Sequence, residues 1–287
     1  MIELRNGACV AAISPMGGEL RSWSVGGRDL LWPGDSAWWN ASAPLLFPIV
    51  GWARNGEVLI DGVRRPMGVH GFAADRAFRI MEQDEAHCRL ELADDAGTRS
   101  VYPFGFSLSV TYALSQDDVS IAFAVANHGE RTMPYALGFH PGFRWPLPAA
   151  ARDGHAVVFA GDEDPSVPVI APGGLFSDER RAAPLDGRRI ALSDDVFAAE
   201  ALCFLNARSR SWGLEGPDGS SIRMDIDGFP HLALWSKPGA PFVCLEAWTG
   251  HGDPVGFEGE LHEKPSMRLL ASGARDEARV RLTYRPT

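Results

Sequence analysis

Apolar and polar residues alternate with a period of two along several segments of the chain. The clearest case is residues 106–114, and after a turn at 115–118 the alternation resumes over 119–125. Side chains of a strand point to opposite faces in turn, so this pattern predicts an antiparallel hairpin with one face on a core. Shorter alternating stretches predict further strands at 88–92, 222–226 and 280–284.

Turn dipeptides separate the short apolar runs, and helical periodicity is nearly absent. Asn-Gly or Asp-Gly occurs at Asn55, Asp61 and Asp218, as is typical of tight turns. The best helical segment is Asp194 to Leu202, with Ser193 as its candidate N-cap. The sequence therefore predicts an all-β, predominantly antiparallel fold, and it lacks the long helices and glycine fingerprint of a dinucleotide-binding domain.

The length and composition are those of one large domain. The chain has 287 residues, of which 45% are hydrophobic, and no linker-like run divides it. We predict a single domain over residues 1–287. The stretch from Pro146 to Gly187 is rich in Pro, Gly, Ala and Asp and has poor periodicity, and we interpret it as loops within this domain.

Charge and cysteine usage limit the partners. A net charge of −10 argues against nucleic acid, whose phosphates require a basic surface. The four cysteines are isolated and lack metal-binding spacing, which indicates buried free thiols. No apolar run approaches the ~20 residues that span a bilayer, and the N-terminus does not resemble a secretory signal. We expect a cytoplasmic protein without a membrane partner.

Three segments each place one titratable residue among glycine and apolar neighbours. They contain His70, His140 and Glu246, which are candidate acid/base residues because burial shifts the pKa of such groups. A glycine-flanked histidine is as typical of a turn as of an active site. Glu246 is the stronger signal, since a glutamate within an apolar strand is rarely buried without a partner. A zinc site of two histidines and one glutamate has only weak support, because no HExxH spacing occurs.

Tryptophan is abundant, and two of the nine lie close to Glu246 in sequence. Trp235 and Trp248 are candidates for stacking against a sugar ring. The pair Trp38-Trp39 is undecided between packing and binding. The chain contains neither a GxSxG elbow nor a phosphate-binding glycine loop, which argues against a serine hydrolase and a nucleotide-dependent kinase.

Four motifs, in this order, resemble the aldose 1-epimerase (galactose mutarotase-like) family. The resemblance runs over most of the chain, and the order and separation of the motifs carry it more than any single one does. The motifs are Leu46-Phe47-Pro48-Ile49-Val50-Gly51, His70-Gly71-Phe72-Ala73, Gly138-Phe139-His140-Pro141-Gly142-Phe143, and Leu245-Glu246 followed by Trp248-Thr249-Gly250.

The resemblance implies a large antiparallel β-sandwich that interconverts the α and β anomers of a free aldose without a cofactor or metal. By position, Glu246 is expected to be the general base at the C1 hydroxyl and His140 the general acid at the ring oxygen. His70 is expected to hydrogen-bond near that oxygen. Asp194 matches the family's hydroxyl-binding aspartate, although it also suits a helix start. Many relatives have an arginine where this chain has Trp52, and the nearest arginine is Arg54.

Two other functions stay open at this point. An epimerase for phosphorylated sugars, such as a hexose 6-phosphate, requires a convergent arginine pocket, and four arginines lie near His70 in sequence. They are Arg54, Arg64, Arg65 and Arg76. A non-catalytic carbohydrate-binding or sensor protein would use the aromatic residues alone. In every case the expected partner is a small-molecule sugar.

Overall fold

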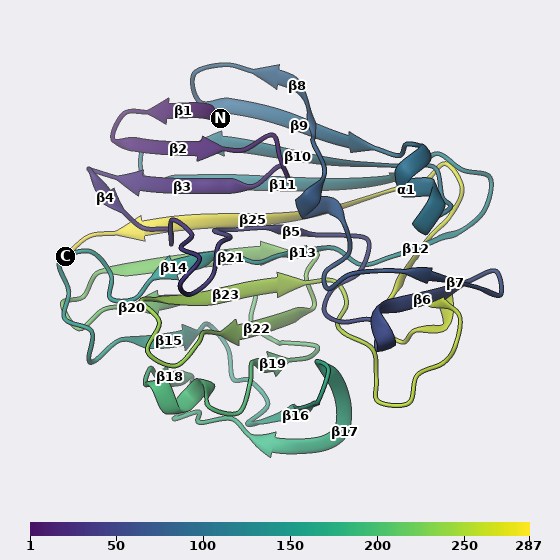
Figure 1. The fold of residues 1–287 in the computed structure, drawn as a ribbon. Coiled ribbons are helices and arrows are strands. Elements are labelled where there is room, and N and C mark those ends of the chain that lie inside the picture. The colour runs from purple at the N-terminus through teal and green to yellow at the C-terminus, as the bar shows by residue number, and fades with distance from the viewer.

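Two large antiparallel sheets build the molecule (Figure 1). The computed structural model describes all residues 1–287. The first sheet has nine strands in the order β18-β15-β20-β21-β25-β11-β10-β9-β8. Along the chain these strands are β8 (Arg79–Gln83), β9 (His87–Ala93), β10 (Phe106–Leu114), β11 (Asp118–Asn127), β15 (Ala156–Phe159), β18 (Arg189–Ala191), β20 (Ser211–Glu215), β21 (Ser221–Asp227) and β25 (Arg275–Arg285).

The second large sheet has six strands, in the order β19-β22-β23-β13-β5 with β14 also paired to β23. These strands are β5 (Leu45–Leu46), β13 (Gly138–Phe139), β14 (Gly142–Arg144), β19 (Leu202–Phe204), β22 (His231–Trp235) and β23 (Phe242–Trp248). Its central strand β23 is buried along its whole length, which makes it a rigid support for functional side chains.

Smaller elements surround these two sheets. A four-stranded sheet contains β1 (Ile2–Asn6), β2 (Cys9–Ile13), β3 (Leu20–Val25) and β4 (Arg28–Asp29). Three two-stranded ribbons pair β6 (Glu57–Ile60) with β7 (Val63–Pro66), β12 (Met133–Tyr135) with β24 (Arg268–Leu270), and β16 (Ser166–Ala171) with β17 (Leu175–Ala182). The helical elements are α1 (Ala96–Val101) and the short turns η1 (Arg54–Gly56), η2 (Ala73–Asp75), η3 (Asp194–Phe197) and η4 (Leu261–Glu263).

One hydrophobic cluster of 69 buried residues runs from Ile2 to Tyr284 and contains side chains of both large sheets. Phe123 of β11 and Phe139 of β13 meet in it with ring centroids 5.8 Å apart. The two sheets therefore pack face to face as a β-sandwich. The six-stranded sheet has its other face free of this core, and that face carries the site described below.

The predicted strands are confirmed. The hairpin of β10 and β11 pairs Phe106 with Asn127 and continues without a shift to Leu114 and Val119, and the other predicted strands lie within β9, β21 and β25. Asp61 and Gly62 have φ values of 55° and 72° and join β6 to β7 as a two-residue turn, as their dipeptide indicates.

Two predictions of local structure are wrong. The stretch 146–187 is not only loops, because β15, β16 and β17 lie in it. The segment 194–202 is not one helix, because only the short turn η3 forms and the chain enters β19 at Leu202. The Ser193 side chain makes no capping hydrogen bond, so this turn has no N-cap to extend it.

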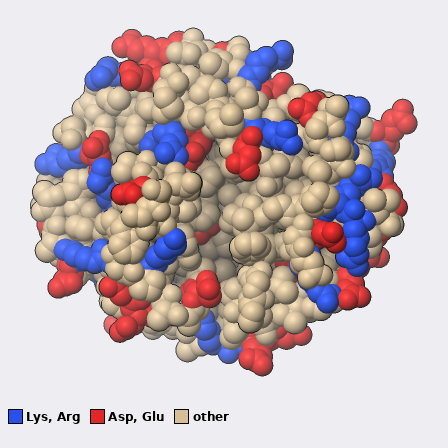
Figure 2. Space-filling model, viewed as in Figure 1, with Lys and Arg blue, Asp and Glu red and all other residues tan.

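The cysteine prediction is confirmed, since Cys9, Cys88, Cys203 and Cys244 are free and buried. No helix has both the length and the apolar character needed to cross a membrane. Charged residues of both signs are interspersed over the face shown in Figure 2, which is hollowed near its centre where Figure 1 draws β13 and β23.

Candidate active site

A cavity of about 610 Å³ opens on the outer face of the six-stranded sheet. It brings together segments that lie more than 200 residues apart in sequence, from Trp39 before β5 to Trp248 at the end of β23. Its walls contain His70, His140 and Glu246, which the sequence singled out. The 17 lining residues are Trp39, Pro44, Gly51, Trp52, Val69, His70, His140, Ile170, Gly173, Gly174, Phe176, Glu200, Ala201, Cys203, Trp235, Glu246 and Trp248.

Glu246 enters the cavity floor from β23. Alternate residues of this strand pack into the main core, so Glu246 points the opposite way. Its side chain is only 2% exposed, and the indole Nε1 of Trp248 donates to its Oε2 at 3.0 Å. Burial raises the pKa of this carboxyl well above its usual range, and the Trp248 hydrogen bond opposes that rise in part. Glu246 is thus a strong base once ionised.

His140 lies at the break between β13 and β14, beside Glu246. Its Nε2 is 3.3 Å from Glu246 Oε2. Its ring stacks on Trp39 at a centroid distance of 4.9 Å and meets the Trp235 ring edge-on at 5.7 Å. Burial, and then the nearby His70, lower the pKa of His140 well below its usual range. Its Nδ1 is buried without a hydrogen-bond partner in the protein, which is uncommon for a buried polar atom.

His70 reaches the cavity from a strained turn. Its φ of 64° lies in the left-handed region, which few non-glycine residues adopt. The Gly51 amide donates to His70 Nδ1 at 3.0 Å, so in the neutral ring the proton is on Nε2. The His70 and His140 rings are 5.7 Å apart. His70 therefore offers an N–H donor next to the His140–Glu246 pair.

Four tryptophans and one phenylalanine supply most of the remaining wall. Trp235 and Trp248 line the cavity, as the sequence indicated, and Trp39, which the sequence left undecided, stacks on His140. Trp52 also lines the cavity and is 48% exposed. Flat aromatic faces of this kind pack against the C–H faces of a sugar.

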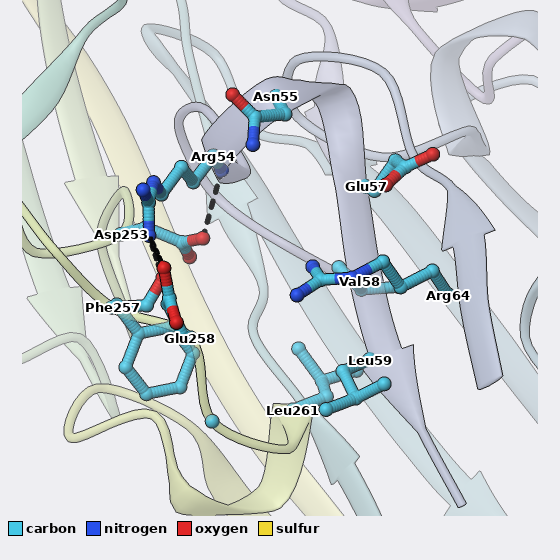
Figure 3. A pocket seen from close by; sticks show the side chains of 11 residues that line it. Arg54, Asn55, Glu57, Val58, Leu59, Arg64, Asp253, Phe257, Glu258 and Leu261 are labelled. Carbon is cyan, nitrogen blue, oxygen red and sulfur yellow. Dashed lines mark hydrogen bonds and ion pairs between the residues drawn. The ribbon is translucent and has the colours of Figure 1, made fainter. Parts of the chain in front are cut away.

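Two residues proposed from the sequence as sugar ligands do not line the cavity. Asp194 begins η3 and accepts a hydrogen bond from Arg152 at 2.9 Å. Arg54 lies in a separate small pocket (Figure 3), where its guanidinium pairs with Glu258 at 2.7 Å. The structure thus brings neither Asp194 nor Arg54 to the cavity, and Arg54 does not take the place of an arginine at Trp52.

Glu200 lines the cavity and was not found from the sequence. It has a φ of 67°, and Arg181 donates to its carbonyl oxygen and to that of Ala201, both at 3.0 Å. Arg181 thereby fixes the backbone of this wall. The Ala-Ala-Glu-Ala context gives no local signal of a binding residue, because only the fold carries Glu200 to the cavity.

The arrangement suits proton transfer more than metal binding. No group of three or more His, Cys, Asp or Glu side chains in the structure is placed to hold a metal ion. One nitrogen of His70 is already occupied by the Gly51 amide. Two titratable groups in contact, with a proton donor beside them, form an arrangement that general acid/base catalysis can use.

Acid is expected to destabilise the protein through its buried neutral histidines. Burial lowers the pKa of His70 and of His231 from 6.5 to about 4. The unfolded chain therefore binds more protons between these pH values, and stability is lost as the pH falls from about 6.5 to about 4. Each histidine is expected to contribute up to about 3 kcal/mol of this loss.

Urea unfolding at several pH values measures how the free energy of unfolding changes with pH, which is the slope compared below. His70→Gln and His231→Gln are each expected to make this slope less steep. At pH 8 both imidazoles are neutral in the folded and the unfolded state, so proton binding is expected to make no difference in stability between each variant and the parent protein. A slope that is the same in both variants as in the parent protein would rule out these histidines as its source.

The sandwich fold agrees with comparison to known proteins. The family model of aldose 1-epimerase matches residues 1–267. The chain therefore belongs to the aldose 1-epimerase family, and its fold is the galactose mutarotase-like β-sandwich.

Relatives match along nearly the whole chain. The protein LacX of Lactococcus lactis, in its plasmid form, is 31% identical over 278 residues, which cover 93% of each chain. A galactose mutarotase-like protein from Lactobacillus casei has a structure with a TM-score of 0.93 at 28% identity, covering 99% of this chain and 100% of that one. A galactose mutarotase related enzyme from Lactobacillus acidophilus has a TM-score of 0.91 at 28% identity, with coverages of 99% and 97%.

Proposed function

We propose that this protein is a mutarotase that interconverts the α and β anomers of an uncharged free aldose. The observation that carries the proposal is the contact of 3.3 Å between His140 Nε2 and Glu246 Oε2 at the floor of an aromatic-lined cavity. The size of the cavity, about 610 Å³, is ordinary for a small-molecule site. Membership of the aldose 1-epimerase family supports the same reaction class.

In the proposed reaction, Glu246 takes the proton of the C1 hydroxyl while His140 gives a proton to the ring oxygen. The bond between C1 and the ring oxygen breaks and leaves an open-chain aldehyde. After rotation about the C1–C2 bond, Glu246 returns its proton to the aldehyde oxygen and His140 recovers its own as the ring closes on the other face. The Nε2–H of His70 donates a hydrogen bond close to the ring oxygen. No group is consumed in the cycle.

The two proton-transfer groups share a single proton. Burial disfavours the charge on each of them separately, raising the pKa of Glu246 and lowering that of His140. One proton placed on the pair keeps it neutral overall, and the two shifts favour Glu246 as its site in the empty cavity. Glu246 acts as the base in the form in which this proton has moved to His140. Excluding water strengthens the interaction of both groups with a bound sugar.

The charges around the cavity favour an uncharged sugar over a phosphorylated one. None of the lining residues is Lys or Arg, and two are glutamates, Glu200 and Glu246. The arginines near His70 in sequence do not converge on it, since Arg65 donates to the Ser100 carbonyl oxygen at 2.8 Å and Arg76 lies over the Phe72 ring. A phosphate would find no cationic partner among the lining residues.

Polarimetry or exchange NMR on freshly dissolved aldoses tests the proposal. We expect acceleration of anomer exchange for at least one neutral aldose, and a kcat/KM at least about tenfold lower for its 6-phosphate, which is a difference of roughly 1.4 kcal/mol. Faster turnover of the phosphate would contradict the substrate class. Calorimetric sugar binding without any acceleration over buffer would instead identify a non-catalytic binding protein.

A further inference from the structure

A buried ion pair lies beside the cavity, and the proposed chemistry does not use it. Lys264 Nζ is 2.9 Å from Asp253 Oδ1, and the two residues are only 2% and 5% exposed. Charged residues are almost never buried in this way without a role or a partner. Ion pairs of this kind often contribute little net stability, since desolvation offsets their attraction. The contacts of the pair with its surroundings are therefore more informative than its own stability.

Asp253 makes three further hydrogen bonds, all of them with segments that form the cavity wall. Its Oδ2 accepts from the Arg54 amide at 2.8 Å, a bond drawn as a dashed line in Figure 3. Its own amide donates to the Trp52 carbonyl oxygen, and its carbonyl oxygen accepts from the Phe176 amide, both at 2.9 Å. Through its side chain and backbone, Asp253 thus ties the segment 52–54 to β17.

The segment held by Asp253 also holds His70. Gly51, directly before Trp52, donates its amide to His70 Nδ1 and accepts the His70 amide at its own carbonyl oxygen. Gly51 packs so closely on the backbone of Gly252 that a Cβ on it would lie 2.7 Å from the Gly252 Cα. The neighbour of Asp253 therefore contacts the residue that selects the His70 tautomer.

Asp253 also holds the part of the cavity wall that contains Trp52. A Cβ on Gly174 would lie 1.9 Å from Trp52 Cδ1, so the indole of Trp52 lies directly against that turn. Asp253 bonds the backbone on both sides of this contact, at Trp52 and at Phe176. A shift of Asp253 would move the Trp52 wall and the Gly51 amide together.

We propose that Asp253 and Lys264 are positioning residues that fix the Gly51–Arg54 segment, and so keep His70 in its Nε2–H tautomer facing the cavity with Trp52 beside it. Lys264 follows the turn η4 and contacts Oδ1 of the Asp253 carboxylate, whereas the Arg54 amide donates to Oδ2. The inference rests on the proposed function for its catalytic meaning, whereas the tautomer of His70 is a property of the folded protein with or without turnover.

The test uses Asp253→Ala, which removes both the ion pair and the acceptor for Arg54, and Lys264→Met, which removes only the anchor. Methionine matches lysine in length and leaves the Asp253 acceptor of the Arg54 amide in place. Nitrogen-15 NMR of the histidine rings shows which nitrogen carries the proton, and loss of one ring signal in His70→Gln assigns His70.

In the parent protein we expect a single His70 tautomer with the proton on Nε2. In both variants we expect a mixture of tautomers, together with a fall in kcat/KM of about 10- to 100-fold, because misplacement by about 1 Å has effects of that size. The matched control is Asp118→Asn, which breaks the ion pair of buried Asp118 with Arg281 in the nine-stranded sheet. It is expected to leave the His70 signals unchanged.

An unchanged His70 spectrum in both variants overturns the proposal, whatever happens to turnover. If Asp253→Ala does not fold, Lys264→Met decides the question with the same spectrum. Because the spectrum reads His70 without a substrate, it also separates the two proposals. A parent protein inactive on every aldose but sensitive at His70 would refute the mutarotase function and keep the positioning role.

Discussion

Replacing Glu246 by glutamine is expected to lower the acceleration of anomer exchange by about 10²- to 10⁴-fold, the usual contribution of a positioned general base. Glutamine has nearly the same shape and still offers an oxygen to the Trp248 indole, which donates to Glu246 at 3.0 Å. The neutral amide avoids the burial of a charge, so the melting temperature is expected to stay the same or to rise. Polarimetry and a thermal melt measure the two effects.

The matched control for this variant is Glu163→Gln. Glu163 is also a buried glutamate, but its carboxylate accepts from the Arg208 and Ser209 backbone amides and does not line the cavity. We expect this variant to keep the acceleration and to lose stability. Full acceleration in Glu246→Gln would show that another group removes the C1 proton, and the mechanism above would then be wrong.

Gly71→Ala is expected to destabilise the protein by at least about 3 kcal/mol, through backbone conformation and overlap together. Gly71 follows His70 and has a φ of 79°, which L residues rarely adopt. A Cβ there would lie 2.3 Å from the Phe47 carbonyl oxygen and 2.5 Å from its carbon, and both are backbone atoms that have little room to move. Urea unfolding measures the change in free energy.

Gly62→Ala separates the two causes. Gly62 has a similar φ of 72°, but a Cβ there would have no atom within 4 Å. Its expected cost is therefore only that of the left-handed conformation, about 1 kcal/mol. Equal losses in the two variants would mean that the contact between Gly71 and Phe47 relaxes easily, and that the turn carrying His70 is less constrained than its geometry indicates.

Much of the fold could be predicted from the sequence because long strands with one buried face leave a clear alternation, as in β10 and β11. The failures have physical causes as well. The ribbon of β16 and β17 contains Pro168 and a charged run from Asp178 to Arg181, and the outer strand β17 is largely exposed, so its pattern resembles a loop. The predicted helix at 194–202 was too long because Asp194 and Asp195 suit a helix start whether or not a helix follows.

The residues of the site that were easiest to predict are those that conflict with their neighbours. Glu246, within an apolar strand, and His70, between glycines, stand out locally, and the structure brings them together with His140. Glu200 and Trp39 have no such local contrast, because their role depends on which strands become neighbours. Asp194 and Arg54 were chosen by position along the chain, and neither lines the cavity, because their side chains pair with Arg152 and Glu258 instead.

The pairing of β5 with β13, and of β13 with β23, has a consequence for how the protein acquires its activity. These strands join residues near 45, 139 and 247, so they meet only after about 86% of the chain, counted as 247 of 287 residues, has been synthesised. Contacts of such sequence separation form slowly. Neither half of the chain holds a working fragment of the catalytic pair, and activity is expected to appear as one of the last events of maturation.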